Sequence, residues 1–141
     1  MRKILAGIVI SLSAINAYAE RWLFLDQFDL LKVYYDHDSI EDVDADQEIF
    51  EVKSKTVMGA NTQYVARGDY SISTVLIDCH NGAVKITGIK FYDKAGKYLH
   101  PNHKQYDWEN PQADTPYAAV GSVVCTIKIP NYLKEIQDNA V

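Results

Sequence analysis

The fold is decided by residues 70–92, YSISTVLIDCHNGAVKITGIKFY. Residues 70–79 show no helical spacing of apolar side chains, which favours a strand. Asn81-Gly82 follows His80, and this dipeptide is the strongest short hairpin signal because both turn positions tolerate positive φ. We therefore expect residues 83–92 to pair back, antiparallel, onto residues 70–79.

Three further strands are predicted on the N-terminal side of this hairpin. Residues 22–25 and 32–35 are short runs of aromatic and branched side chains, with a connection at residues 26–29. Residues 48–57 alternate: positions 50, 52, 54 and 56 are apolar or small, whereas 51, 53 and 55 are charged. Such alternation is typical of a strand with one solvated face.

On the C-terminal side, one short strand and two helices are predicted. Residues 93–96 form a turn sequence, and a strand around Tyr98 and Leu99 is interrupted by Pro101. Thr115-Pro116 suits the start of a helix that runs to about Cys125, and a second helix begins after Pro130, with Asn131 as its cap. Gly121 weakens the first helix. The fold class is thus α+β, a single antiparallel meander with a C-terminal helix packed against it.

The N-terminal residues have the three parts of a secretory signal peptide. Arg2 and Lys3 are basic, residues 4–15 are mostly apolar, and Ala17-Tyr18-Ala19 is a small-residue exit. The apolar run is too short for a membrane span, which needs about 20 residues. We expect residues 1–19 to be cleaved, leaving one exported domain at residues 20–141. The leader has no cysteine for a lipid anchor, so the mature protein is expected to be unanchored. We expect it in the periplasm, at the outer-membrane surface or secreted.

The two cysteines, Cys79 and Cys125, both lie in the exported part, where thiols are more often oxidised than metal-bound. We expect one disulfide between them, the alternative being two unpaired buried cysteines. Closing a loop of about 47 residues would contribute about 4 kcal/mol through the entropy of the unfolded chain.

The charge balance argues against nucleic acid as a partner. All nineteen carboxylates lie from Glu20 onward, whereas two of the fourteen basic residues lie in the leader, so its removal changes the formal charge from −5 to −7. Binding to a phosphate backbone depends on lysine and arginine neutralising its charge. No nucleic-acid partner is therefore expected.

An acidic segment, residues 36–51, holds eight carboxylates in sixteen residues. Asp42, Asp44 and Asp46 match the first three ligand positions of an EF-hand loop. The match then fails, since Gln47 replaces the turn glycine and Lys53 replaces the closing glutamate. The three aspartates stay candidates for a looser calcium site, and the alternative is a solvated hairpin tip whose charges favour solubility.

Arg67-Gly68-Asp69 spells the integrin-recognition tripeptide within a predicted loop between two strands. A glycine turn could present the two opposite charges to a receptor, so these three residues are candidates for partner binding. The alternative is that the glycine only forms the turn before the strand at residue 70.

Neither a metal nor a catalytic constellation is predicted. His100 and His103, with Asp107 nearby, are spaced as in some metal pairs, but Pro101 argues against the helix that would place them on one face. No serine lies in a glycine elbow, and no phosphate-binding glycine loop is present. We expect no cofactor and no enzyme activity.

The aromatic residues are divided between core and surface. Most of a first set is expected in the core: Trp22, Tyr34, Tyr35, Tyr92, Tyr98 and Trp108. Three others have less apolar company and are expected on an exposed contact surface: Tyr106, Tyr117 and Tyr132.

A series of short motifs follows one order along the chain: Trp22, Tyr34-Tyr35-Asp36 with Ser39-Ile40, Asp78-Cys79, Tyr92-Asp93 with Gly96, Trp108 and Cys125. Over residues 22–125 this order resembles the surface-adhesin protein E family of Gram-negative bacteria. The resemblance implies an antiparallel sheet with a packed helix, and an adhesin that binds host matrix and serum proteins. The matching positions are scaffold, so no binding residue is carried over.

These observations predict a non-catalytic, exported, adhesin-like envelope protein that binds host extracellular-matrix or other protein partners. The family's named member is lipid-anchored, whereas this leader lacks the anchor cysteine. That difference favours the alternative, a periplasmic structural or assembly factor with no adhesion role. No membrane span is expected, and unpaired strands at the sheet edges favour a homodimer.

Overall fold

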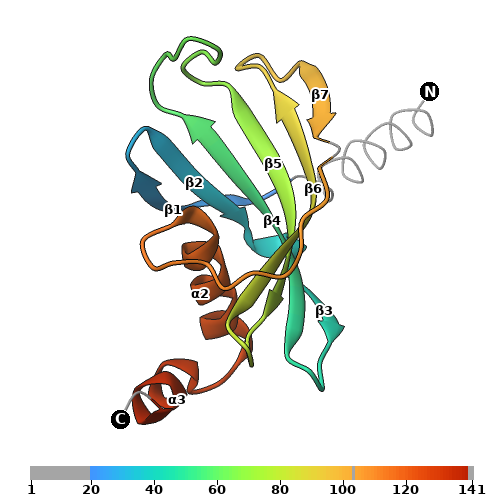
Figure 1. The fold of residues 1–141 in the computed structure, drawn as a ribbon, viewed down its shortest axis with the longest axis vertical. Coiled ribbons are helices and arrows are strands. Elements are labelled where there is room, and N and C mark those ends of the chain that lie inside the picture. Colours follow the sequence, from blue (N-terminus) through green and yellow to red (C-terminus); the bar gives the residue numbers. More distant parts are fainter. Residues whose placement is uncertain (1–19, 103, 140–141) are drawn as a thin grey trace, which may run out of the picture.

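A single seven-stranded antiparallel sheet is followed by two C-terminal helices in the computed structural model, which describes residues 20–102 and 104–139 (Figure 1). The predicted signal peptide, residues 1–19, lies outside the described residues. The elements are β1 (Trp22–Phe28), β2 (Leu31–Asp36), the 3-10 turn η1 (His37–Ser39), β3 (Glu41–Asp44), β4 (Ile49–Met58), β5 (Tyr70–Asp78), β6 (Ala83–Tyr92), β7 (Tyr98–Asn102), α2 (Pro116–Lys128) and α3 (Tyr132–Asn139). The predicted α+β class is confirmed.

The strand order β1-β2-β4-β5-β6-β7 confirms the predicted meander, and the hairpin at Asn81-Gly82 joins β5 to β6 as expected. The sequence did not predict β3, because its residues EDVD offer no apolar face. β3 pairs with the first residues of β4, whereas β2 pairs with the last five. η1 makes the step between them, and Ser39 Oγ accepts a hydrogen bond from the Lys53 N–H at 2.9 Å. β2 and β3 therefore share one edge of β4.

Two strand ends differ from the prediction. β1 continues to Phe28, which pairs with Leu31, so the predicted connection at residues 26–29 shrinks to a tight turn in which Asp29 has φ 50°. β7 continues through Pro101, which pairs with Lys90. A proline is compatible with an edge strand because only one side of that strand carries a hydrogen-bond ladder. Local breaker signals were therefore overridden by pairing with a neighbouring strand.

The core lies on one side of the sheet, which we call the inner face. It is lined by alternate residues of four strands, and α2 covers it with its own buried valines. The fully buried residues are Val33, Val52, Val75, Ile77, Val120 and Val124. Gly121 of α2 faces the sheet, and a Cβ there would lie 3.6 Å from Val84 Cγ1. This distance is an ordinary van der Waals contact, so the helix and the sheet leave room for one methyl group at Gly121.

The disulfide between Cys79 and Cys125 is confirmed, with S–S 2.06 Å and Cα–Cα 5.7 Å. It ties the last turns of α2 to the chain just after β5. As predicted, Thr115 is the residue before the helix and Pro116 opens it, although α2 runs three residues past Cys125.

Figure 1 shows α2 against the lower half of the sheet, so the upper ends of β4 to β7 have no helix over them. Within residues 20–102 and 104–139, no helix combines the length and the apolar character needed to cross a membrane.

Candidate binding site

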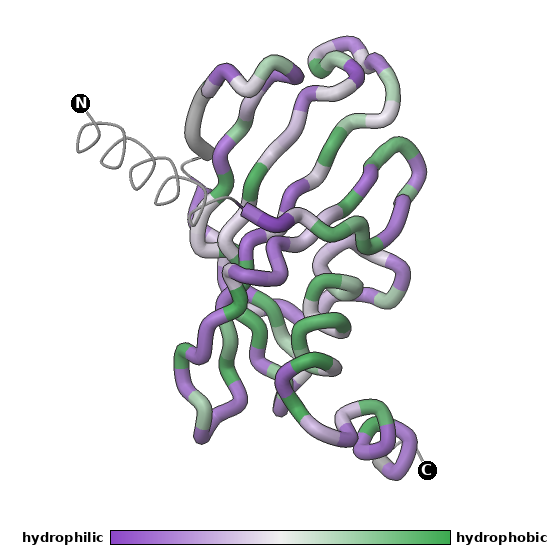
Figure 2. Tube along the Cα trace, turned by 180° about the vertical axis from the view of Figure 1, so that it is seen from behind, coloured by the Kyte–Doolittle hydropathy of each residue, from purple (hydrophilic) through white to green (hydrophobic). Residues whose placement is uncertain are grey.

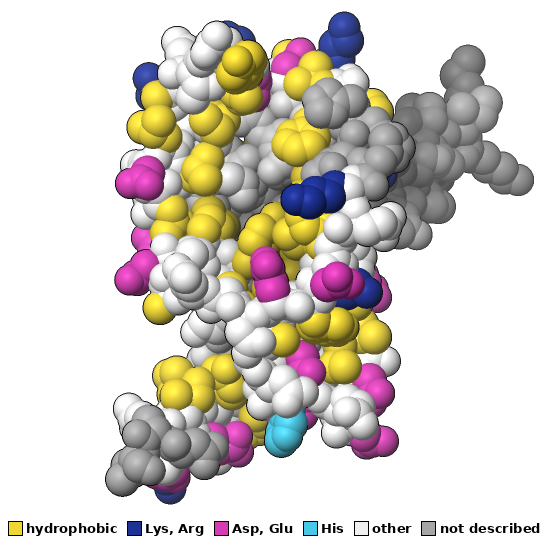
Figure 3. All heavy atoms as spheres, in the orientation of Figure 1, with side chains coloured by type: hydrophobic (Ala, Val, Ile, Leu, Met, Phe, Trp, Pro, Cys, Tyr) yellow, Lys and Arg dark blue, Asp and Glu magenta, His cyan; other side chains and the backbone are white. Residues whose placement is uncertain are grey.

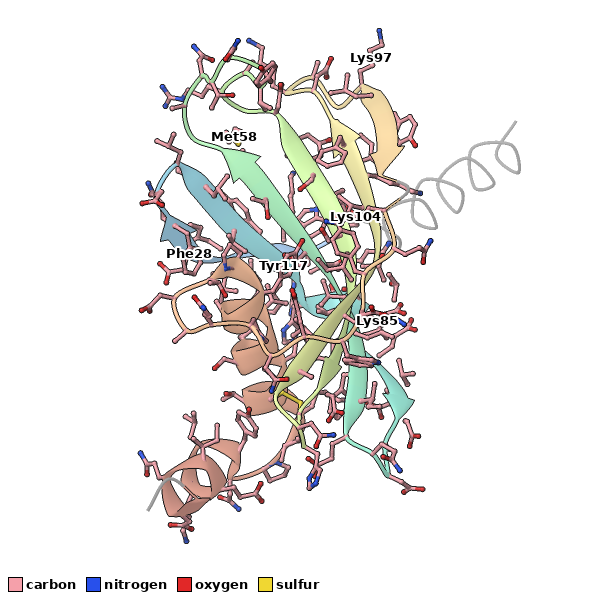
Figure 4. All side chains as sticks on the ribbon, in the orientation of Figure 1. Phe28, Met58, Lys85, Lys97, Lys104 and Tyr117 are labelled. Carbon is pink, nitrogen blue, oxygen red and sulfur yellow. A yellow bond between two sulfur atoms is a disulfide. The ribbon has the colours of Figure 1, made fainter. Side chains whose placement is uncertain are left out.

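The uncovered upper half of the inner face forms a groove of about 260 Å³, which we call the upper groove. Its floor consists of inner-face side chains that α2 does not cover, and its rim comes from the β4–β5 loop and β7. The lining residues are Leu31, Thr56, Met58, Tyr64, Val65, Asp69, Tyr70, Ser71, Phe91, Tyr92 and Leu99. Met58 lies above the end of α2 that carries Tyr117 (Figure 4). Hydrophobic side chains gather over this half of the molecule (Figure 3).

The rim is a loop, residues 59–69, that is held by its own hydrogen bonds. Asn61 Oδ1 accepts from the Arg67 N–H at 2.8 Å, and Thr62 Oγ1 accepts from the Val65 N–H at 3.0 Å. At its base a Cβ on Gly59 would lie 2.8 Å from the Leu30 carbonyl oxygen, so only glycine fits there. These bonds fix a compact loop whose tip residue, Tyr64, is 87% exposed. An apolar ring is therefore presented to solvent by an ordered backbone.

The predicted tripeptide Arg67-Gly68-Asp69 ends this loop, but its two charges are used differently. Asp69 accepts the Ala66 N–H through Oδ2 at 3.0 Å and the Lys94 N–H through Oδ1 at 3.1 Å. The half-buried carboxylate thus joins the loop to the β6–β7 turn, whereas Arg67 is exposed. Gly68 has φ 91°, as a turn glycine should. The geometry gives Asp69 a structural role, and integrin binding stays a prediction.

The three candidate calcium ligands have separate environments. Asp42 on β3 pairs with Lys128 Nζ at 2.9 Å, and Asp44 accepts the Gln47 N–H at 3.2 Å. Asp46 is exposed at the tip of the β3–β4 hairpin. Across the described part of the chain, no three His, Cys, Asp or Glu side chains gather as a metal site requires. Of the two histidines considered for zinc, His103 lies outside the described residues, and only the backbone of His100 is described.

The aromatic predictions were partly wrong. Most of the six aromatic residues in the first set were expected in the core, but Tyr35 alone is buried, and Tyr98 and Trp108 are 47% and 42% exposed. Tyr117 was expected at the surface, yet its ring packs against the core and its hydroxyl lies 3.0 Å from Ser73 Oγ. Burial raises the pKa of Tyr117 above its ordinary value, which the hydrogen bond with Ser73 partly opposes. Tyr132 is also half-buried, and burial followed by the charge of Glu48 raises its pKa.

The other side of the sheet, the outer face, gathers most of the misplaced aromatic rings. Phe24 and Tyr34 meet edge to face at 5.5 Å, and Tyr70 stacks on Tyr92 at 5.2 Å. Lys55 Nζ lies between two rings, 4.3 Å from the Tyr70 centroid and 5.7 Å from that of Trp22. Seen from behind, hydrophilic and hydrophobic positions alternate along the strands (Figure 2). The charged positions 51, 53 and 55 were the sequence signal for this face.

Comparisons with known proteins agree with this architecture. The family model described as surface-adhesin protein E matches residues 22–126. Two solved structures of Haemophilus influenzae protein E are similar in fold. One has TM-score 0.54 and 17% identity over 76% of this chain and 85% of the other. The second, crystal form II, has TM-score 0.55 and 18% identity over 68% and 81%. No curated protein matches the chain.

Proposed function

We propose that this chain, which belongs to the surface-adhesin protein E family, is a non-catalytic, adhesin-like protein of the bacterial envelope that binds other proteins. The family description supports the adhesin-like and non-catalytic parts of this proposal. Export is supported by the leader sequence and by the disulfide, which is typical of oxidising compartments. The expected partners are host extracellular-matrix proteins.

The upper groove is the observation that carries this proposal. Tyr64, Val65 and Leu99 are exposed apolar side chains on its rim, and Met58 and Phe91 line its floor. Aromatic anchors beside an apolar groove are the usual centre of a protein interface. Because hydrogen bonds already hold the loop, binding would cost little ordering entropy. The groove therefore suits an apolar side chain or short segment of a partner protein.

Binding to a panel of purified host matrix proteins, measured by biolayer interferometry, tests the proposal. Tyr64→Ser should weaken binding at least about tenfold, as expected for loss of an interface anchor. Leu133→Ser is the control, because Leu133 is an exposed apolar residue on α3, away from the groove. The proposal fails if no matrix protein binds, or if the two variants lose the same affinity.

Protease treatment of intact cells tests where the protein acts. An adhesin displayed outside the outer membrane would be cut, whereas a periplasmic factor would be protected until the cells are opened. Protection in intact cells, together with absence from the medium, would overturn the adhesin role in favour of a periplasmic one.

A further inference from the structure

Four lysine side chains from three strands, β2, β4 and β6, lie on the outer face. Cross-strand pairing places Phe24, Tyr34, Lys55, Ile72 and Lys90 in one row. The neighbouring rows add Lys32 beside Val57 on one side and Lys53 beside Thr74 on the other. These four lysines lie on the upper outer face of a chain whose formal charge is −5. This part of the outer face therefore gathers positive charge, although the chain as a whole is negatively charged.

A groove of about 290 Å³, the outer groove, runs between these lysines. It is lined by Glu20, Lys53, Ile72, Thr74, Gly88, Ile89, Lys90 and Tyr92. Gly88 leaves its floor open, since a Cβ there would meet nothing within 4 Å. Tyr92 forms one wall and is held in place by its stacking on Tyr70. The site thus offers two exposed ammonium groups on either side of a trough with an aromatic wall.

The acidic groups near this groove are already engaged or lie further along the sheet. Glu20 Oε1 lies 3.9 Å from Lys53 Nζ, and Glu20 Oε2 accepts the Trp22 indole N–H at 3.0 Å. Glu51 is next on the outer side of β4, opposite Leu76, at the lower end. Asp36, which pairs with Trp22 at the end of β2, is buried on the same side and accepts the Arg21 and Asp38 N–H groups. Among the described residues, the positive field of Lys53, Lys55 and Lys90 is therefore opposed by Glu20 and by the buried Asp36.

We propose that the outer groove binds an acidic polysaccharide, one whose sulfate or carboxylate groups pair with Lys53 and Lys90 while a sugar ring lies over Gly88 against Tyr92. Charge complementarity selects an anion, because Lys53, Lys55 and Lys90 lie beside or around this groove. The trough favours a linear chain of sugar rings, which can lie within it. A flat membrane surface would contact the lysine ammonium groups without entering the trough. This site lies across the sheet from the upper groove, with Tyr92 at the border of both, and does not depend on the proposed protein partner.

Titration calorimetry with a defined heparin octasaccharide at physiological salt tests the proposal. The intact protein should bind, and the double variant Lys53→Gln/Lys90→Gln should bind about tenfold more weakly, because two exposed ion pairs are lost. Lys97→Gln/Lys134→Gln is the matched control, with the same change in net charge at exposed lysines outside the groove. Its affinity should stay within about twofold of the unmodified protein.

A second variant separates the groove from charge alone. Gly88→Leu fills the trough without changing any charge, and the open space and strand backbone at this position make it compatible with folding. It should weaken heparin binding about tenfold and leave the thermal unfolding midpoint unchanged. Equal weakening by the two lysine pairs, or an unchanged affinity of Gly88→Leu, would overturn the proposal. Failure to bind heparin would do the same, and binding of phosphatidylglycerol vesicles instead would assign the face to a membrane surface.

Discussion

The inner and outer faces of the sheet are made by the same strands and the same two-residue alternation, yet they differ in what covers them. Val75 and Leu76 are neighbours on β5; Val75 is fully buried under α2, whereas Leu76 faces outward in the row of Glu51 and Lys85. The inner face packs against α2, which the disulfide ties to the end of β5. In the described part of the chain, the outer face has no helix over it, and its aromatic rings and lysines contact solvent. Substitutions on the inner face should therefore change stability, and those on the outer face should mainly change binding.

The largest effect is expected at the disulfide, which fixes α2 to the inner face. Replacing Cys79 and Cys125 by alanine should lower the free energy of unfolding by about 4 kcal/mol, because the unfolded chain regains the entropy of an open loop. Urea unfolding of the double variant, and of the unmodified protein with and without reductant, measures this loss. An unchanged midpoint would mean that α2 holds the inner face without the covalent link.

The next largest effect directly compares the two faces on one strand. Val75→Ala should lower the free energy of unfolding by about 2 kcal/mol, since it opens a cavity against Val52 and Ile86. Leu76→Ala removes a larger side chain but should cost less than about 1 kcal/mol, because no helix packs on it. Equal losses in urea unfolding would contradict the assignment of the outer face as uncovered.

The hydrogen bond between Tyr117 and Ser73 is expected to contribute about 1 kcal/mol, because Ser73 is only 2% exposed and loses its partner in Tyr117→Phe. The raised pKa of Tyr117 adds a pH dependence. Its stabilising effect is complete below pH 10.0, the ordinary tyrosine value, and is lost as the pH rises through the higher folded pKa, because the unfolded chain ionises first. Urea unfolding at increasing alkaline pH should therefore show a shallower decline for Tyr117→Phe. An equal decline in both proteins would contradict the burial of this hydroxyl.

The smallest effect is a predicted gain. Gly121→Ala should raise the free energy of unfolding by about 0.5–1 kcal/mol through helix propensity, since its Cβ would make ordinary contacts with Val84 and Ile77. Gly82→Ala is the control: it has free space, but its φ of 65° disfavours alanine, so a loss is expected. A loss at Gly121 would show that the inner face has no room for one methyl group.

Much of the fold could be predicted because its signals are local. Asn81-Gly82 indicates the central hairpin, alternation marks β4, and Thr115-Pro116 marks the start of α2. The prediction was wrong where pairing overrode a local signal, as at Pro101, and where a strand had no apolar face, as in β3. The upper groove and the outer groove were both missed, because no contiguous segment contains either of them.

The sequence by itself determined the strands, the turns, the helix start and the cysteine pair of an exported chain, because backbone conformation and alternation depend on neighbouring residues. Only the tertiary structure decided which side of the sheet α2 covers and where it stops. The packing of α2 half-buries Tyr117 and leaves the groove beside the exposed Tyr64 uncovered. Strand pairing places Lys32, Lys53, Lys55 and Lys90 on the open face. The physical reason is that burial and local charge depend on which distant segments pack together, and strand pairing brings together residues far apart in the chain.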